Sequence, residues 1–203
     1  MAMIRSITRK PELTYAVAEL FPLQGQWTDA EYLALNTNRL IELVDGNLEV
    51  LEMPTPYHQL IVLRLGALLY TFVAARQLGQ VLVAPLRVRL WPGRFREPDL
   101  VFMAAAHADR ITKKYWGVPD LAIEIISPDD PDRDRVIKKT EYAQAGIPEY
   151  WILDPEEKTL EVNLLPAEEE EYQLSQTLGI QDSLASAQLP GFELILADLF
   201  AEE

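Results

Sequence analysis

The sequence predicts a single α/β (α+β) domain in which helices flank a mixed β-sheet. Two observations support this prediction. Short β-favouring runs alternate with turn residues in the first half of the chain, which is typical of antiparallel hairpins. Later, a strand, a helix and a second strand follow one another over residues 118–126, 133–145 and 147–153, a unit whose two strands lie parallel. A chain of 203 residues suits one well-buried domain better than two.

Residues 28–203 are predicted as the folded domain and residues 1–27 as an N-terminal extension. The domain opens with Thr28, and Glu31 follows at the spacing of a capping box, so a short helix is predicted over residues 28–35. The basic N-terminal residues are not followed by an apolar segment with a small-residue cleavage site, so we expect a cytoplasmic protein. No apolar run approaches the roughly 20 residues of a membrane span, so we expect no membrane association.

Turn and cap signals define a hairpin and the longest helix. Asp45-Gly46 separates strand-like runs at residues 40–44 and 47–51, and this dipeptide is one of the strongest two-residue hairpin signals. Thr55-Pro56 supplies a capping hydroxyl and a proline at the first helical position, so a helix is predicted from there to about Gln77. Its apolar residues are too many for a narrow stripe, which predicts that the helix packs centrally against the sheet.

The remaining elements follow in chain order. Strands are predicted at residues 80–83, 87–90, 99–102 and 118–126, with a polar surface loop at 107–116. A turn at 127–132 leads to a helix at 133–145, which ends before Gly146, and strands follow at 147–153 and 159–164. The acidic run at 168–171 is interpreted as a solvated loop, and residues 189–200 as a strand or turn followed by a short docking helix.

The net charge of −14 argues at first against nucleic acid, but the acidic residues are unevenly distributed. Residues 140–203 hold fifteen acidic residues against one basic residue, so the rest of the chain is neutral overall. Within residues 87–139 eleven Lys and Arg outnumber nine Asp and Glu. A local basic surface holds phosphates within a Debye length of about 8 Å, so DNA binding of modest affinity is expected. The alternative is that these basic residues form an ordinary solvated surface without a role in binding. Arg87 and Arg89 would then lie on the solvent-facing side of a strand.

The available residue types restrict any metal site. The chain has no cysteine and only two histidines, which excludes thiolate zinc sites and a histidine-rich cage. A metal must therefore be held mainly by oxygen atoms. That donor set is typical of Mg²⁺ or Mn²⁺, which prefer carboxylate, carbonyl and water ligands.

Two acidic residues occupy positions that need an explanation. Asp99 follows Pro98 at the start of an apolar strand, and Glu124 lies inside the run 118–126, which lacks polar alternation and is predicted to be buried on both faces. An unpaired carboxylate there is costly or shifts its pKa until it is neutral. A divalent metal shared by Asp99 and Glu124 would offset that cost. The alternative is an internal salt bridge, for example to Lys138.

Lys138 lies on the helix that follows Glu124. On that helix it shares a face with Asp134 and Tyr142, at intervals of four residues. Two acids and a nearby ammonium group are the minimum set for metal-assisted hydrolysis of a phosphodiester. The alternative for Lys138 is an ordinary surface pair with Asp134.

Several short motifs support a more specific interpretation. They are Asp45-Gly46 after Glu42, the Pro-x-Pro-x-His run at 54–58, Pro98-Asp99, Pro119-Asp-Leu with the run from Glu124 to Pro128, Lys138 to Tyr142, and the run from Gly146 to Pro155. Together they resemble the large bacterial family described as putative restriction endonucleases, which belongs to the PD-(D/E)XK nuclease superfamily. The resemblance runs from about residue 28 to the Leu-Pro-Gly at 189–191.

The resemblance implies a restriction-endonuclease-like fold, a Mg²⁺-type cofactor, DNA as the substrate and a homodimer. It makes Asp99 the first acid of the motif and Glu124 the second, both as metal ligands. The motif's lysine is expected two residues after the second acid, where this chain has Ile126. The resemblance therefore implies that the lysine has moved to the following helix, with Lys138 as the candidate and Lys139 as the second choice.

Glu42 and His58 are auxiliary candidates, because superfamily members often place an additional acid on an early element and both residues could line the same cleft. A satisfied core or capping role is the alternative for each. Two other functions stay open beside a DNA endonuclease. One is a catalytically inactive dimeric module that keeps the nuclease fold and binds a partner, and the other is a hydrolase of another phosphodiester.

Overall fold

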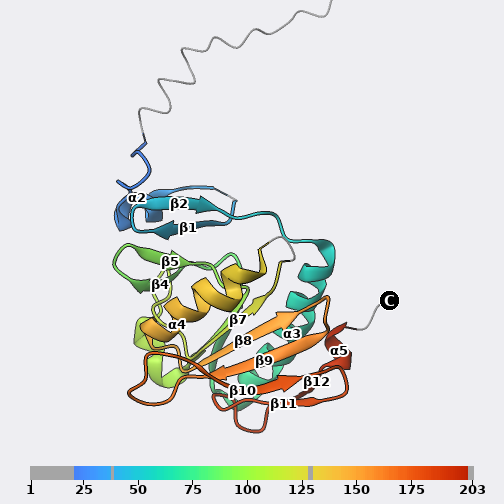
Figure 1. Ribbon diagram of the computed structural model, residues 1–203. Coiled ribbons are helices and arrows are strands. Elements are labelled where there is room, and N and C mark those ends of the chain that lie inside the picture. The colour runs from blue at the N-terminus through green and yellow to red at the C-terminus, as the bar shows by residue number, and fades with distance from the viewer. Residues whose placement is uncertain (1–20, 38, 128–129, 201–203) are drawn as a thin grey trace, which may run out of the picture.

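The protein, a computed structural model, is described over residues 21–37, 39–127 and 130–200 (Figure 1). Most of the predicted N-terminal extension, residues 1–20, lies outside the described residues, as do residues 128–129 of the predicted turn. A six-stranded sheet is the centre of the fold. In spatial order its strands are β10 (Gln173–Leu178), β9 (Thr159–Leu164), β8 (Glu149–Asp154), β7 (Leu121–Ile125), β6 (Leu100–Ala104) and β3 (Gly79–Val83).

The prediction of a mixed sheet is confirmed. β7 and β8 are parallel, and the other neighbours in this sheet pair antiparallel. Between β7 and β8 the chain forms a π-type turn, η2 (Arg133–Lys138), that continues into α4 (Lys139–Ala145). This is the predicted strand–helix–strand unit, with a strand at 121–125 that is shorter than the predicted 118–126.

Two helical segments cover opposite faces of the sheet (Figure 1). The long helix α3 (Pro56–Arg76) packs with Leu121, Ile123 and Ile125 of β7 in one buried cluster. Ala122 belongs to a second cluster that includes Tyr142 of α4. Because side chains alternate between the faces of a strand, Glu124 lies on the face that η2 and α4 cover.

A smaller antiparallel sheet lies above the first. Its order is β2 (Asn47–Val50), β1 (Ile41–Val44), β5 (Arg94–Arg96) and β4 (Val88–Trp91), and α2 (Asp29–Ala34) packs beside it (Figure 1). The β1–β2 turn at Asp45 and Gly46 has φ values of 49° and 80°, as a two-residue hairpin of this type requires. Thr28 and Glu31 form the predicted capping box on α2.

Several short elements were not predicted. These are β5, β10, β11 (Ser183–Ala185) and η1 (Ala105–Arg110), the last in place of part of the predicted loop. Trp116, at the end of that loop, is buried, and its backbone N–H donates to the backbone carbonyl of Arg87 at 2.9 Å. The C-terminal part ends in β12 (Glu193–Ile195) and α5 (Ala197–Phe200), as the predicted strand and docking helix.

The length and apolar composition of helix α3 bear on the expectation of no membrane association. Within the described part of the chain it is one helix that is long and apolar enough, by length and composition alone, to cross a membrane. A core helix of a soluble protein has the same properties. Ile61, Leu65, Leu69 and Val73 form a buried stripe that packs α3 on the sheet, as the sequence predicted. Leu63 and Leu68, which the sequence prediction also counted, are exposed instead.

Candidate active site

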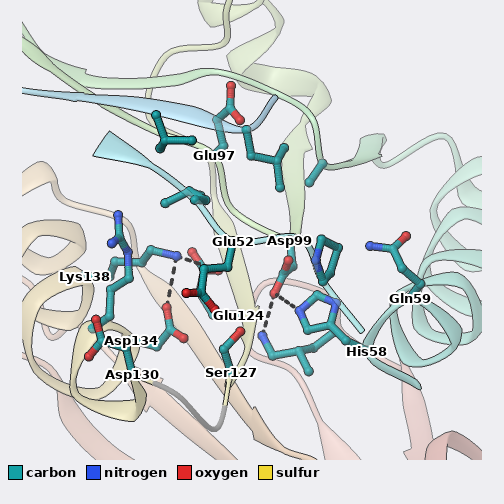
Figure 2. Close-up of a pocket in the computed structure, with 17 residues that line it drawn as sticks. Glu52, His58, Gln59, Glu97, Asp99, Glu124, Ser127, Asp130, Asp134 and Lys138 are labelled. Atoms are coloured by element: carbon teal, nitrogen blue, oxygen red, sulfur yellow. Dashed lines mark hydrogen bonds and ion pairs between the residues drawn. The ribbon is translucent and has the colours of Figure 1, made fainter. Parts of the chain in front are cut away.

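Strand register brings the two predicted acids together. β6 and β7 are antiparallel, and Leu100 pairs with Ile123. Extending this register by one residue beyond the end of β6 sets Asp99 opposite Glu124, so the two acids are neighbours where the ladder ends. Both line one cavity of about 310 Å³ (Figure 2). The structure therefore places the two candidate metal ligands in a single cleft.

Glu124 is the buried carboxylate of this cleft, with an exposed fraction of 2%. Its Oε2 lies 3.0 Å from Nζ of Lys138, and its Oε1 accepts a 2.6 Å hydrogen bond from the hydroxyl of Tyr142. Burial raises the pKa of Glu124, and the positive charge of Lys138 acts in the opposite direction. A further positive charge in the cleft would stabilise the ionised form.

Lys138 and Asp134 enter the cleft from η2. Both side chains are buried, and the ammonium of Lys138 lies 3.0 Å from Oδ1 of Asp134 (Figure 2). The alternative, in which Lys138 forms an ordinary surface pair with Asp134, is wrong because both side chains are buried. Lys139 is half-buried and is not among the described residues that line the cavity. Of the two lysines, the geometry therefore favours Lys138. Single π-type turns are frequent at functional sites.

Asp99 is held by two donors that share its Oδ2. The backbone N–H of Ile125 donates to it at 2.8 Å, and Nε2 of His58 donates at 3.1 Å (Figure 2). Although burial lowers the pKa of His58, the hydrogen bond and the charge of Asp99 outweigh this effect and raise it. His58 lines the cavity, and Thr55 serves as the cap of α3 by accepting from the backbone N–H of His58. The structure thus brings His58 into the site.

Glu42 is not placed in the cleft. It is fully buried on β1, where its Oε2 lies 2.6 Å from Arg96 and 2.5 Å from Arg133, and its Oε1 accepts from the backbone N–H of Glu97. Burial alone would raise the pKa of Glu42, but the charges of Lys138, Arg96 and Arg133 outweigh it and lower the pKa to about 2. Glu42 is not among the described residues that line the cavity, and its partners match the satisfied core role that the sequence left open for it.

The partners of Glu42 form an ionic network that sequence reasoning missed. Arg96 is 2% exposed and donates to both carboxylate oxygens of Glu141, at 2.7 and 2.8 Å, as well as to Glu42. Glu141 precedes Tyr142 on α4, so the network ties β1 and β5 to the helix that carries Lys138. The missed signal was an arginine directly before Glu97-Pro-Asp, but its partners lie 45 and 54 residues away in sequence.

The predicted basic surface is largely neutralised by neighbouring acids. Most of the Lys and Arg in residues 87–139 form ion pairs, namely Arg87, Arg89, Arg94, Arg96, Arg133, Arg135 and Lys138. Arg133 lines the cavity but is engaged by Glu42 and by Glu49 at 2.7 Å. The positive charge that brackets the site therefore organises the fold at least as much as it offers contacts to phosphate.

The donor set of the cleft fits a hard divalent cation that retains water. Among the residues that the structure describes, no three His, Asp or Glu side chains form a complete metal-binding cluster. Asp99 and Glu124 instead offer two carboxylates in an open cavity, and Mg²⁺ is commonly held by one or two carboxylates, with water and phosphate oxygens completing its shell. A divalent charge beside Glu124 would also offset the cost of its burial. Mg²⁺ or Mn²⁺ therefore fits these residues.

The family of the chain is shown by comparison with protein-family models. A family model described as "Uma2: Putative restriction endonuclease" matches residues 28–197, which include every residue of the cleft discussed above. The chain belongs to this family. The resemblance found in the sequence motifs is thus confirmed, and membership of Uma2 supports a nuclease function.

A solved structure shows the same fold. It is described as the crystal structure of a putative nuclease belonging to DUF820 from Anabaena variabilis, and it superposes on the Uma2 chain with a TM-score of 0.70 at 20% sequence identity. The match covers 86% of this chain and 97% of the other. Among curated proteins no sequence matches the chain. The nuclease-like fold is therefore shown by coordinates as well as by motifs.

The ionic network predicts an acid-sensitive contribution of Glu42 to stability. Because the pKa of Glu42 is about 2 in the fold and 4.5 as its reference value, its stabilisation is present above pH 4.5 and is lost as the pH falls through 2. Glu42→Gln should lower the free energy of unfolding by on the order of 3 kcal/mol near pH 7. Chemical denaturation of both proteins at several pH values measures this difference.

Glu49→Gln is the matched control. Glu49 contacts the same two arginines, but its side chain is 37% exposed, so the loss should stay below about 1 kcal/mol. Equal losses for the two variants, or a loss for Glu42→Gln that persists unchanged at pH 2 to 3, would contradict the assignment.

Proposed function

We propose that this Uma2 protein is a metal-dependent DNA endonuclease that hydrolyses phosphodiester bonds at the cleft of Asp99, Glu124 and Lys138. The observation that carries the proposal is the placement of Glu124. Glu124 has Lys138 as a buried ion-pair partner, the alternative that the sequence left open, so its burial alone does not require a metal. It also lines the same open cavity as Asp99, so two carboxylates and one ammonium group face a single space in which a divalent ion could bind. The lysine is present in the same cleft although the usual motif position holds Ile126.

In this proposal Asp99 and Glu124 hold Mg²⁺ or Mn²⁺. Such an ion, when bound, lowers the pKa of a water ligand and neutralises charge on the phosphoryl oxygens. His58 and the N–H of Ile125 fix the orientation of Asp99 by occupying its Oδ2. The hydroxyl of Tyr142 fixes Glu124 in the same way.

In this proposal Lys138 supplies the positive charge of the site. Burial would lower the pKa of Lys138, but the charges of Glu124 and Asp134 outweigh it and raise the pKa, so the side chain is an ammonium at neutral pH. An ammonium can donate to a phosphoryl oxygen or orient the attacking water, and both stabilise charge that develops in the transition state. A lysine from η2 thereby compensates for the one that is absent at position 126, directly after β7.

We also propose that two copies of the chain associate. Leu63 and Tyr70 of α3 are strongly exposed. Leu82 and Val83 of β3, an edge strand of the large sheet, are exposed to a lesser extent. Exposed apolar side chains beside an unpaired edge are typical of an association surface. Light scattering should give the mass of two chains for the wild type and of one chain for Val83→Lys. A monomeric wild type would refute this part of the proposal.

The cleavage assay tests the catalytic proposal. With Mn²⁺ the wild type should nick plasmid DNA or cut single-stranded DNA, and Asp99→Ala, Glu124→Ala and Lys138→Ala should each reduce the rate by about 100-fold or more. Lys139→Ala is the control, because it removes a neighbouring lysine that is not in the cleft. It should retain wild-type activity.

Two outcomes would change the conclusion. Turnover of a small phosphodiester such as bis(p-nitrophenyl) phosphate, without cleavage of any DNA, would indicate a hydrolase of another phosphodiester. No turnover of either substrate by folded, metal-loaded protein would favour the inactive nuclease-fold module. DNA affinity should be modest in all cases, because the arginines near the cleft are already paired.

A further inference from the structure

The cleft holds more negative than positive charge on the side chains that meet at Glu124. Lys138 lies between two carboxylates, 3.0 Å from Oε2 of Glu124 and 3.0 Å from Oδ1 of Asp134 (Figure 2). Asp134 is 6% exposed, and among the ion pairs of the described residues it pairs with Lys138 alone. The metal-dependent mechanism proposed above uses Asp99, Glu124 and Lys138 but gives Asp134 no role.

Lys138 and the proposed metal ion would compete for Glu124. Oε2 of Glu124 is the oxygen that Lys138 occupies, and Glu124 is also a proposed metal ligand. A divalent ion on Glu124 repels an ammonium that lies 3.0 Å from the same carboxylate, and the low dielectric of a buried site strengthens that repulsion. The metal can therefore bind well only if Lys138 has another anion to hold it.

Asp134 is placed to be that anion. It lies one turn before Lys138 on η2 and already contacts the ammonium at 3.0 Å, so Lys138 can release Glu124 and keep an anionic partner without leaving the cleft. The turn itself is fixed, because the hydroxyl of Tyr150 donates to the backbone carbonyl of Asp134 at 3.0 Å and Arg133 is held by Glu42 and Glu49.

We propose that Asp134 is a positioning residue that draws the ammonium of Lys138 away from Glu124 when a divalent cation occupies the site. Lys138 thereby changes from a partner of Glu124 to a donor held beside the bound phosphodiester. The inference rests on the proposed metal-dependent function and adds a residue to it. Asp134 does not need to touch the metal or the substrate.

A simpler explanation would give Asp134 only a long-range effect. Any carboxylate near a cation increases the affinity for it, so a weaker metal affinity of Asp134→Asn would not by itself support the proposal. The two explanations differ in whether the effect depends on Lys138. A double-mutant cycle isolates that dependence.

The experiment is a titration of Mn²⁺ by calorimetry into the wild type, Asp134→Asn, Lys138→Met and the double variant. Asp134→Asn should weaken Mn²⁺ binding by about tenfold, which is about 1.4 kcal/mol, because Lys138 then stays on Glu124. Lys138→Met should bind Mn²⁺ more tightly than the wild type while losing activity, because the competing ammonium is gone. In the Lys138→Met background the effect of Asp134→Asn should shrink to about threefold or less.

Asp154→Asn is the matched control. It removes the ion pair between Asp154 and Arg135, a residue of η2, but Asp154 is not among the described residues that line the cavity. It should leave Mn²⁺ affinity unchanged. Melting temperatures establish that each variant folds. If Lys138→Met does not fold, Lys138→Gln takes its place in the experiment.

The outcomes distinguish failure of the positioning role of Asp134 from failure of the metal-dependent function. Equal tenfold losses from Asp134→Asn in both backgrounds, or weaker binding by Lys138→Met, would overturn the positioning role and leave the metal-dependent nuclease intact. No Mn²⁺ binding by the wild type would instead remove the proposed function on which the inference rests.

Discussion

The buried charge of Glu124 is the constraint on which the rest of the site depends. It lies in the middle of a sheet whose neighbouring positions are apolar, so the fold must bring cationic and hydrogen-bonding groups to it. A single helical segment does this by presenting Asp134, Lys138 and Tyr142 on one face. The helix between β7 and β8 is therefore part of the chemistry as well as a structural crossover, and its position relative to β7 decides whether the site exists.

That position is set by a second buried ionic group that adjoins the cleft, since its Arg133 also lines the cavity. Arg96 joins Glu42 of β1 to Glu141 of α4, and Arg133 joins Glu42 to the start of η2. Buried pairs of this kind add little net stability compared with apolar packing, but removing one partner leaves an uncompensated charge. The network thus locks the small sheet to the helix that carries Lys138. It also accounts for why an acidic Uma2 protein contains so many arginines close to its site.

Local signals were sufficient for much of the fold. The capping box at Thr28, the Asp45-Gly46 turn and the Thr55-Pro56 start each specify a structure within a few residues, and all three are present. β5 and β10 were missed because short strands acquire their structure from partners distant in sequence. The site divides in the same way. The cost of burying Glu124 is visible in its own strand, whereas the core role of Glu42 depends on Arg96, a partner 54 residues away in sequence. Burial of Asp134 and Lys138 depends on helix packing, which an i, i+4 spacing does not reveal.

The central claim is that Asp99 and Glu124 form one metal site. Crystals soaked in Mn²⁺ and measured at the manganese absorption edge test it most directly, because anomalous scattering locates the ion without assumptions about activity. The account predicts a peak within about 2.5 Å of a carboxylate oxygen of each of these two residues, with Lys138 shifted towards Asp134. A peak elsewhere, or a cleft that stays without a peak at saturating Mn²⁺ while Lys138 remains on Glu124, would contradict it.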